Sequence, residues 1–417
     1  MRYLFLLLPF MGFAQEALTL EDCYRLARDH YPTVQKLDLI AKSEDYTLAN
    51  ANKAYLPQVS ITGQATYQSE TIDFSQSIGR LPLPITLPTV SKDQYKVVGE
   101  VSQLLYNGGA TRAQKQLIKA QSAVQAQAVE TQLYTLKLRV SNLYFGVLLI
   151  DAQLFQNQTN AETVQSQLEK AEVALKNGTT LPSNVAELKA ELVCLAMQRT
   201  EYEATKAMYL QMLSTFIGKS LPSDTTLPRP KPTALGTTNH RPELKGFDLQ
   251  QSVLDIQRRQ LTSEYLPKIG LFFQGAYGRP TLNIIKNEFD FYYIAGVRLQ
   301  WNLSPLYSLS NKKQLLQLQG ESLSADRKAF LMSTELDLTQ QQTQISKLQR
   351  LMEQDQESVA LRHSVAQAAQ VQLDNGVITT HEYLQKVNAE NLAKQTLLLH
   401  EIQLLQAQEN QRLVTND

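Results

Sequence analysis

The chain has 417 residues, with 40 basic and 40 acidic side chains and a formal net charge of zero at pH 7. This balance gives no electrostatic basis for binding nucleic acid. Two cysteines, Cys23 and Cys194, are too few for a disulfide framework, and without a CxxC motif we expect both to be packing residues. The histidines lack metal-ligand spacing, and no nucleophile triad, phosphate loop or paired-carboxylate motif occurs. The sequence therefore predicts a protein that is not an enzyme and uses no cofactor or metal ion.

The first residues have the pattern of a secretory signal peptide. A basic residue precedes an apolar run, and cleavage is expected near Ala14, so we assign residues 1–14 to the signal. That run is too short to cross a bilayer as a helix, and no later segment has about 18 to 20 consecutive apolar residues. Lipidation at Cys23 is rejected because Glu21 and Asp22 stand where small residues would be needed. We expect an exported chain in which strands make any membrane crossing.

The mature chain reads as two copies of one plan. Residues 15–218 are predicted to hold a helix capped by Thr19, two strands near 58–68 and 95–105, and a helical hairpin over 110–216. A proline-rich linker or equatorial segment, 219–240, follows. Residues 241–417 repeat the plan, with strands near 268–278 and 289–301 and a helical hairpin over 310–412.

The duplication is visible in exact residue matches. Tyr55-Leu56-Pro57 returns as Tyr265-Leu266-Pro267, 210 positions later, and Asn177-Gly178 returns as Asn375-Gly376, 198 positions later. The two Asn-Gly pairs predict left-handed ends of the outgoing helices. Capping-box spacing of Asn184 with Glu187, and of Thr379 with Glu382, predicts the starts of the returning helices. Apolar residues three and four apart from Leu133 to Leu154 predict a seam for packing against another helix.

Apolar and polar residues alternate along the expected strands, most clearly from Tyr55 to Gln68. A half-buried strand of a soluble sheet would also alternate, so the pattern alone leaves both readings open. In a membrane, the apolar residues would face lipid: Val59, Ile61, Tyr67, Val97, Phe291, Tyr293 and Val297. The polar residues would face a lumen: Gln58, Thr62, Gln64, Lys96, Glu100 and Arg298. Aromatic residues at the strand ends would then form an interfacial girdle.

Four strands of about ten residues are long enough to cross a bilayer at a tilt. They are too few to close a barrel, and an open strand edge in lipid leaves unpaired backbone groups at several kcal/mol each. The barrel must therefore be shared between chains. Two chains would give eight strands with a filled interior, whereas three would give twelve strands and room for water beside the polar faces.

Several stretches resemble the TolC-like outer-membrane efflux proteins, also called outer membrane factors. They are LTLEDCYRLARDHYP, YLPQVSITGQATY, VSQLLYNGG, RPELKGFDLQ, YLPKIGLFFQGAYG, LQWNLSPLY and the two NG-containing hairpin tips. The resemblance covers nearly the whole mature chain. It implies a homotrimer of mixed α and β class, in which four transmembrane strands per chain contribute to a shared 12-stranded β-barrel in the outer membrane. Long antiparallel coiled-coil hairpins would form a periplasmic tunnel.

The resemblance also implies partners and the residues that meet them. In that family the helical tips dock onto a periplasmic adaptor (membrane fusion) protein and an inner-membrane pump. The positions carried over are Asn177, Gly178, Ser183, Asn184, Val185, Asn375, Gly376, Thr379, Glu382 and Leu384. Asn184 replaces the family's usual acid in the first copy. Of the acidic positions that narrow the entrance in that family, Glu382 keeps an acid, while Gln385, Ile378 and Leu373 occupy the others.

The leading functional hypothesis is an outer-membrane exit duct of a tripartite efflux system that passes small molecules to the outside. It would reside in the outer membrane of a Gram-negative-type cell, with a periplasmic helical portion. One alternative is the outer-membrane channel of a type I protein secretion system. Another, from a different class, is an exported coiled-coil scaffold whose strands form an ordinary soluble sheet. Detergent dependence would separate the scaffold from the two channels.

Overall fold

The computed structural model describes residues 18–72, 89–231, 238–283 and 286–416. The signal peptide predicted over residues 1–14 lies outside these ranges. The chain divides into two compact units. One, the hairpin unit, comprises Met1–Leu37, Gln127–Lys245 and Arg327–Asp417. The other, the strand unit, comprises Asp38–Ala126 and Gly246–Asp326.

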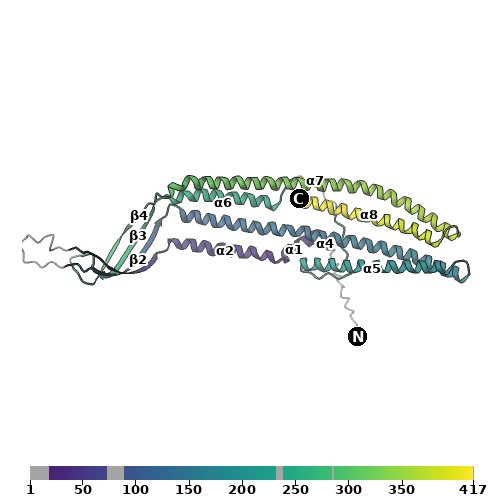
Figure 1. Ribbon diagram of the computed structural model, residues 1–417, viewed down its shortest axis with the longest axis horizontal. Coiled ribbons are helices and arrows are strands. Elements are labelled where there is room, and N and C mark those ends of the chain that lie inside the picture. Colours follow the sequence, from purple (N-terminus) through teal and green to yellow (C-terminus); the bar gives the residue numbers. More distant parts are fainter. Residues whose placement is uncertain (1–17, 73–88, 232–237, 284–285, 417) are drawn as a thin grey trace, which may run out of the picture. The chain divides into compact units, whose positions relative to one another are not determined.

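The strand unit is built on one antiparallel sheet with strand order β1-β2-β3-β4. Its strands are β1 (Gln58–Tyr67), β2 (Asp93–Tyr106), β3 (Lys268–Arg279) and β4 (Asp290–Gln300); Figure 1 shows β2, β3 and β4 side by side. Most of α2 (Gln35–Asn52) and α6 (Pro242–Glu264) also belong to this unit, and the short helix η2 (Lys53–Tyr55) precedes β1. The alternating sequence explains the strands, because a period of two places one set of side chains on each face.

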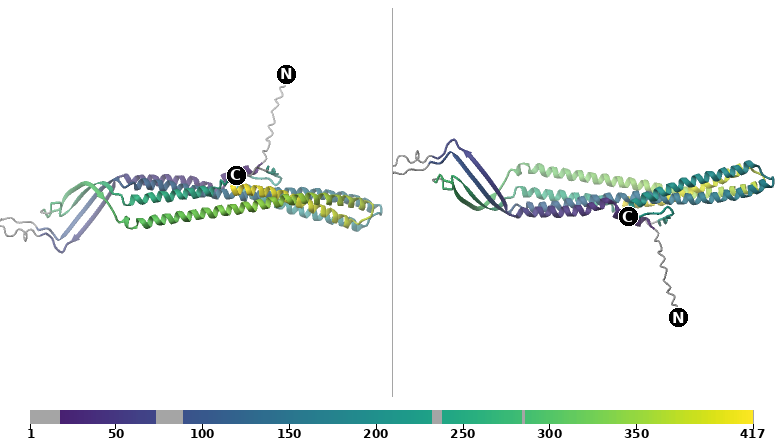
Figure 2. Two further views of the ribbon diagram at one scale, coloured as in Figure 1. Left: turned by 90° about the horizontal axis from the view of Figure 1, so that it is seen from above. Right: turned by 90° about the horizontal axis from the view of Figure 1, so that it is seen from below.

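The hairpin unit contains the greater part of two antiparallel helical hairpins, while residues 110–126 and 305–326 of their outgoing helices belong to the strand unit. The first joins α4 (Ala110–Lys176) to α5 (Pro182–Ile217), and the second joins α7 (Pro305–Asp374) to α8 (Thr380–Thr415). Figure 2 shows both turns from two further sides. The short α1 (Leu20–His30) and η1 (Pro32–Val34) complete the unit. The predicted cap of α1 is confirmed, since the hydroxyl oxygen of Thr19 accepts from the Asp22 N–H at 3.2 Å.

The main core lies where α1, α4, α5 and α8 meet. The predicted seam of α4 is buried at Leu133, Leu136, Val140, Leu143, Val147 and Ile150. Val140, Leu143 and Val147 belong to this core. Tyr144 is completely buried, and its hydroxyl donates to the carbonyl of Pro228 at 2.7 Å. Tyr144 thereby fastens the segment after α5, where residues 219–231 and 238–240 form no helix or strand.

The two cysteines differ in environment. Cys23 is fully buried in the core, and burial raises the pKa of its thiol to about 12. The expectation of a packing role is met there. For Cys194 it is wrong, because that side chain is exposed. Cys194 precedes the buried Leu195 on α5, and its own side chain lies off the buried face of that helix.

One described helix, α4, is long and apolar enough by composition to cross a membrane. More than half of its most apolar window, 56%, is buried inside the protein. The apolar stretch of α4 is therefore explained by its place in the protein core, where α4 packs against α1, α5 and α8.

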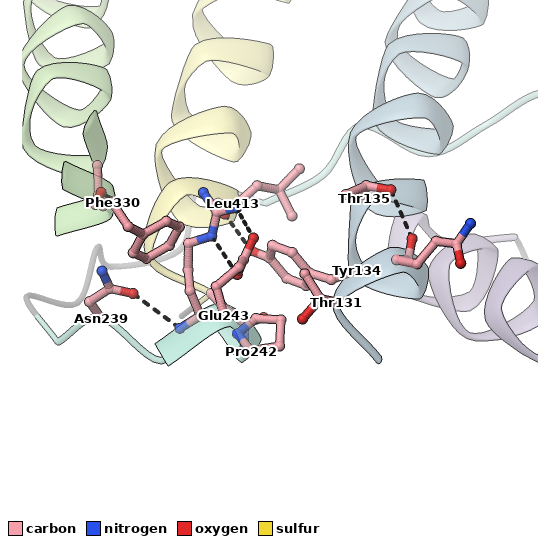
Figure 3. A network of polar contacts seen from close by, with 12 residues as sticks. Thr131, Tyr134, Thr135, Asn239, Pro242, Glu243, Phe330 and Leu413 are labelled. Atoms are coloured by element: carbon pink, nitrogen blue, oxygen red, sulfur yellow. Dashed lines mark hydrogen bonds and ion pairs between the residues drawn. The ribbon is translucent and has the colours of Figure 1, made fainter. Parts of the chain in front are cut away.

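A polar network holds the end of α8 against α4 and the start of α6 within the hairpin unit. Figure 3 shows Tyr134 directed toward Leu413, whose carbonyl accepts its hydroxyl hydrogen bond, with Glu243 and Asn239 nearby. The guanidinium of Arg241 pairs with Glu243 and lies 5.6 Å from the centre of the Tyr134 ring. These contacts join residues far apart in sequence, so the C-terminal helix is fixed to the middle of the chain.

Three helices begin at prolines: α5 at Pro182, α6 at Pro242 and α7 at Pro305. Proline fits the first helical position because its missing N–H would have no partner there. The predicted capping box of Asn184 with Glu187 is therefore wrong. The N-cap of α5 is Leu181, which makes no side-chain capping bond, and the Asn184 amide donates instead to the Thr180 hydroxyl at 2.9 Å.

Candidate functional site

The first candidate site is the sheet, whose register places like side chains on like faces. Directly paired residues of antiparallel strands share a face. Val59 pairs with Val101 and Ile61 with Gly99, while Ser60 pairs with Glu100. Following the register across all four strands, the seven residues predicted to face lipid share one face. The six predicted to face a lumen share the other.

The apolar face is fully uncovered in the single chain. Ile61 is 78% exposed and Phe291 79%, and Tyr67, Tyr293 and Val297 are also exposed. Aromatic rings stack along this face, and the ring centres of Phe273 and Tyr293 lie 5.9 Å apart. Such a surface on a soluble monomer would be an aggregation hazard, so it requires an apolar environment or partner.

Aromatic and charged side chains mark the end of the sheet at the β3–β4 turn. Asp93 and Arg279 form an ion pair there, and the Arg279 guanidinium lies 5.1 Å from the centre of the Phe289 ring. At the helix end of the sheet, the indole N–H of Trp301 donates to the carbonyl of Tyr265 at 2.9 Å. Polar groups thus occur at both ends of the apolar band, where a bilayer has its interfaces.

The second candidate site is the pair of helical tips. In the first, the Gly178 N–H donates to the Leu175 carbonyl at 3.0 Å and the Thr179 N–H to the Ala174 carbonyl at 2.9 Å. In the second, Gly376 and Val377 make the same two bonds, to Leu373 at 3.0 Å and Gln372 at 2.8 Å. Both glycines have positive φ, +73° for Gly178 and +67° for Gly376. The predicted left-handed helix ends are confirmed, and both are Schellman motifs.

The returning helix of the second tip begins with the predicted capping box. The Thr379 hydroxyl accepts from the Glu382 N–H at 3.2 Å, and the Thr379 N–H donates to Glu382 Oε2 at 2.8 Å. These hydrogen bonds lower the pKa of the Glu382 carboxyl. A lowered pKa means that this stabilisation is complete above the ordinary pKa of a glutamate and is lost as the pH falls through the lowered value. The cap is therefore intact at neutral pH.

Side chains of the two hairpins meet near the tips. A buried cluster there draws on all four long helices: Val164, Leu168, Val185, Leu188, Leu195, Ala369, Tyr383, Leu384 and Val387. Around it, the Gln167 amide donates to Gln370 Oε1 at 2.6 Å, and His381 Nδ1 lies 2.6 Å from Glu187 Oε1. No periodic signal in the sequence relates these polar pairs, since each joins residues about two hundred positions apart.

Burial separates the predicted tip residues into two groups. Val185 and Leu384 are buried in the cluster between the hairpins. The exposed members are Asn177, Gly178, Ser183, Asn375, Gly376, Thr379 and Glu382, with Asn184 half-buried. The sequence pattern missed two exposed apolar residues of the turns, Leu181 and Val377, which are 64% and 70% exposed. Among the described residues, no cluster of three or more histidine, cysteine or acidic side chains could hold a metal ion.

Comparison with known proteins matches this architecture. Residues 23–214 match the family model described as "Outer membrane efflux protein". The search of curated proteins found no match to the chain. Among solved structures, the fold is similar to that of the outer membrane protein VceC from Vibrio cholerae, with a TM-score of 0.65 and 13% identity over 95% of both chains.

Two further solved channels have the same fold. The CmeC outer membrane channel of Campylobacter jejuni gives a TM-score of 0.63 at 13% identity, over 95% of this chain and 85% of that one. The open state of the Neisseria gonorrhoeae MtrE outer membrane channel gives a TM-score of 0.64 at 12% identity, over 95% of this chain and 88% of that one. The chain therefore shares the mixed α and β fold of these outer membrane channels.

The family model covers slightly less than half of the chain, and over that part the chain is similar to the outer membrane efflux proteins, the family that its sequence motifs indicated.

Proposed function

We propose that this chain forms, as a homotrimer, the exit duct of a tripartite efflux system that carries small molecules across the outer membrane. The observation that carries the proposal is the sheet, which has an uncovered apolar face, a polar face and two outer edges. Within the described residues, β1 and β4 each have one strand neighbour. In hydrocarbon each unpaired backbone group costs several kcal/mol, so these edges require partners.

Three copies meet that requirement with twelve strands, enough to surround a water-filled lumen. The ten residues of β1, at about 3.3 Å each and a tilt of about 40°, span about 25 Å, the height of the apolar band of such barrels. The residues with exposed apolar side chains would face lipid. Gln58, Thr62, Gln64, Lys96, Glu100 and Arg298 would face the lumen.

Helices of the strand unit also present apolar side chains that the single chain leaves uncovered. Helix α2 has no buried residue, and its Leu39 and Tyr46 are exposed. At the start of α7, Tyr307 is 90% exposed, and Leu315 and Leu318 are uncovered as well. Contact between neighbouring copies would cover both surfaces, which supports a tunnel assembled from several chains.

The exposed tip residues are the proposed contact with a periplasmic adaptor, and through it with an inner-membrane pump. Leu181 and Val377 offer apolar contacts beside the polar residues of the turns. A central apolar anchor with a polar rim is the usual composition of a protein interface. The duct itself would perform no chemistry, and its partners would supply energy and select the cargo.

Replacing Gly376 by valine is expected to weaken adaptor binding and export. The positive φ of Gly376 costs a β-branched residue about 1–3 kcal/mol, whereas no atom lies within 4 Å of an added Cβ, so backbone strain and not a clash is tested. Cross-linking to the adaptor and dye export measure the effect. Gly376→Asn is the control, because asparagine tolerates this conformation. Unchanged export and adaptor cross-linking in Gly376→Val would refute the role of this turn.

A deletion strain tests efflux against the two alternatives. Without the chain, we expect cells to accumulate small toxic compounds and to recover when it is restored. Retention of a secreted polypeptide with normal handling of small compounds would favour type I secretion, the second channel candidate. A mature chain that is monomeric and stable in buffer without detergent would instead favour the exported scaffold.

A further inference from the structure

The charged residues of the sheet lie almost entirely on its polar face. In the described strands, the apolar face carries only Asp93 and Arg279, which pair with each other at one end. The charged residues of the polar face are Lys96, Lys268 and Arg298, which are cationic, and Glu100 and Asp290, which are anionic. Lumen-facing charges act directly on ions in a pore, so their balance bears on selectivity.

Glu100 is the centre of this arrangement. Its Oε1 lies 2.9 Å from Nη1 of Arg298, and its Oε2 accepts a hydrogen bond from Nε2 of Gln274 at 2.6 Å. Gln274 stands directly opposite Glu100 on β3. The Arg298 guanidinium also lies 4.6 Å from the centre of the Phe272 ring. Three strands therefore hold the cation and the anion side by side, with both carboxylate oxygens occupied.

The ion pair is open to solvent, because the side chain of Arg298 is 50% exposed and that of Glu100 22%. Exposed ion pairs contribute little to stability, so folding alone does not account for the arrangement. Its larger consequence is electrostatic, since each charge cancels the field of the other in the space above the sheet. Lys96 and Asp290 are a second cation and anion at one level of the sheet. Both pair with Gly278, so they lie in one row, two strands apart.

We infer that Glu100 and Arg298 form a charge-compensated belt that adds no net charge to the barrel lumen at its own level, so that this level favours solutes of neither sign. The inference rests on the proposed function, because it requires the polar face to line a water-filled barrel. Three copies would place three such pairs around the lumen at one level. The belt then passes cationic, anionic and neutral compounds alike, and selection among them falls to other parts of the duct or to the pump.

The electrostatic potential beside Glu100 can be measured from the reactivity of a cysteine placed opposite it. Ser60 pairs with Glu100 on β1, and Ser60→Cys is introduced in a Cys194→Ser background, because Cys194 is exposed whereas Cys23 is buried. The purified channel in liposomes is treated with cationic and anionic methanethiosulfonate reagents of equal size. Each rate is normalised to that of a free thiol in solution. The ratio of cationic to anionic rates measures the potential beside residue 60, independently of any barrier elsewhere in the tunnel.

We expect a ratio near one in this parent. Glu100→Gln should lower the ratio about five-fold, as expected for one unit charge removed within about 8 Å in water. Arg298→Gln should raise the ratio by a smaller factor, because Arg298 is on β4 and lies beyond Glu100 as seen from residue 60. The double variant should return the ratio towards that of the parent, and molar salt should suppress all of these differences. If the residue 60 thiol is modified readily but the ratio is unchanged in both single variants, the proposed belt is wrong and the proposed duct still stands. A residue 60 thiol that neither reagent reaches would overturn the duct and the belt together.

Discussion

Lysine in place of Ile61 is expected to abolish most assembly of the channel in the outer membrane. Ile61 is at the middle of β1, on the uncovered face with Gly99, Gly275 and Tyr293 in its row. A lysine facing lipid near the midplane costs about 2–4 kcal/mol, and a homotrimer would carry three of them. The yield of heat-sensitive trimer in the outer-membrane fraction measures the effect.

The matched control is Thr62→Lys, one residue further along the same strand. Its side chain is on the opposite face, in the row of Val98, so we expect nearly normal trimer yield. Val97 and Lys96 on β2 offer a second pair, with aspartate at Val97 harmful and aspartate at Lys96 tolerated. Equal yields from Ile61→Lys and Thr62→Lys would mean that the two faces have been assigned wrongly.

Removing the side chain of Tyr144 is expected to cause the largest loss of stability in the hairpin unit. The ring is completely buried, and its hydroxyl donates to the carbonyls of Pro228 at 2.7 Å and Leu18 at 3.3 Å. Truncating a buried aromatic residue to alanine costs about 3–5 kcal/mol. Tyr144→Phe keeps the ring and loses the hydrogen bonds, so about 1–1.5 kcal/mol is expected. The denaturant midpoint of helical circular dichroism in detergent ranks the variants.

Phe155 on the same helix provides the control, because its ring is 74% exposed. Phe155→Ala should shift the midpoint much less than Tyr144→Ala. A similar shift in both variants would show that burial in the core formed by α1, α4, α5 and α8 does not dominate the stability of this unit.

The strands and their faces were predictable because alternation is local and appears in every strand. Once register pairs Ile61 with Gly99, each row follows from a period of two. Strand ends were less predictable, and β2 begins at Asp93 and runs to Tyr106, beyond the expected 95–105. Pairing with neighbouring strands extends both ends of β2: Asp93 pairs with Tyr67 of β1, and Tyr106 pairs with Ile269 of β3, which is distant in sequence.

The tips show what sequence could and could not reveal. Glycine with positive φ has a strong local signature, so both Schellman ends were predicted, as was the cap at Thr379. The start of α5 was misplaced because Pro182 is compatible with a first helical turn as well as with a break. The pairs His381–Glu187 and Gln167–Gln370 were missed because tertiary packing alone brings them together.

The most direct measurement of the central claim is mass per particle in detergent combined with single-channel conductance in a planar bilayer. We expect a particle containing three copies of the mature chain and a stepwise conductance from that same particle. A monomer that stays soluble without detergent, or a trimer that conducts no ions, would contradict it.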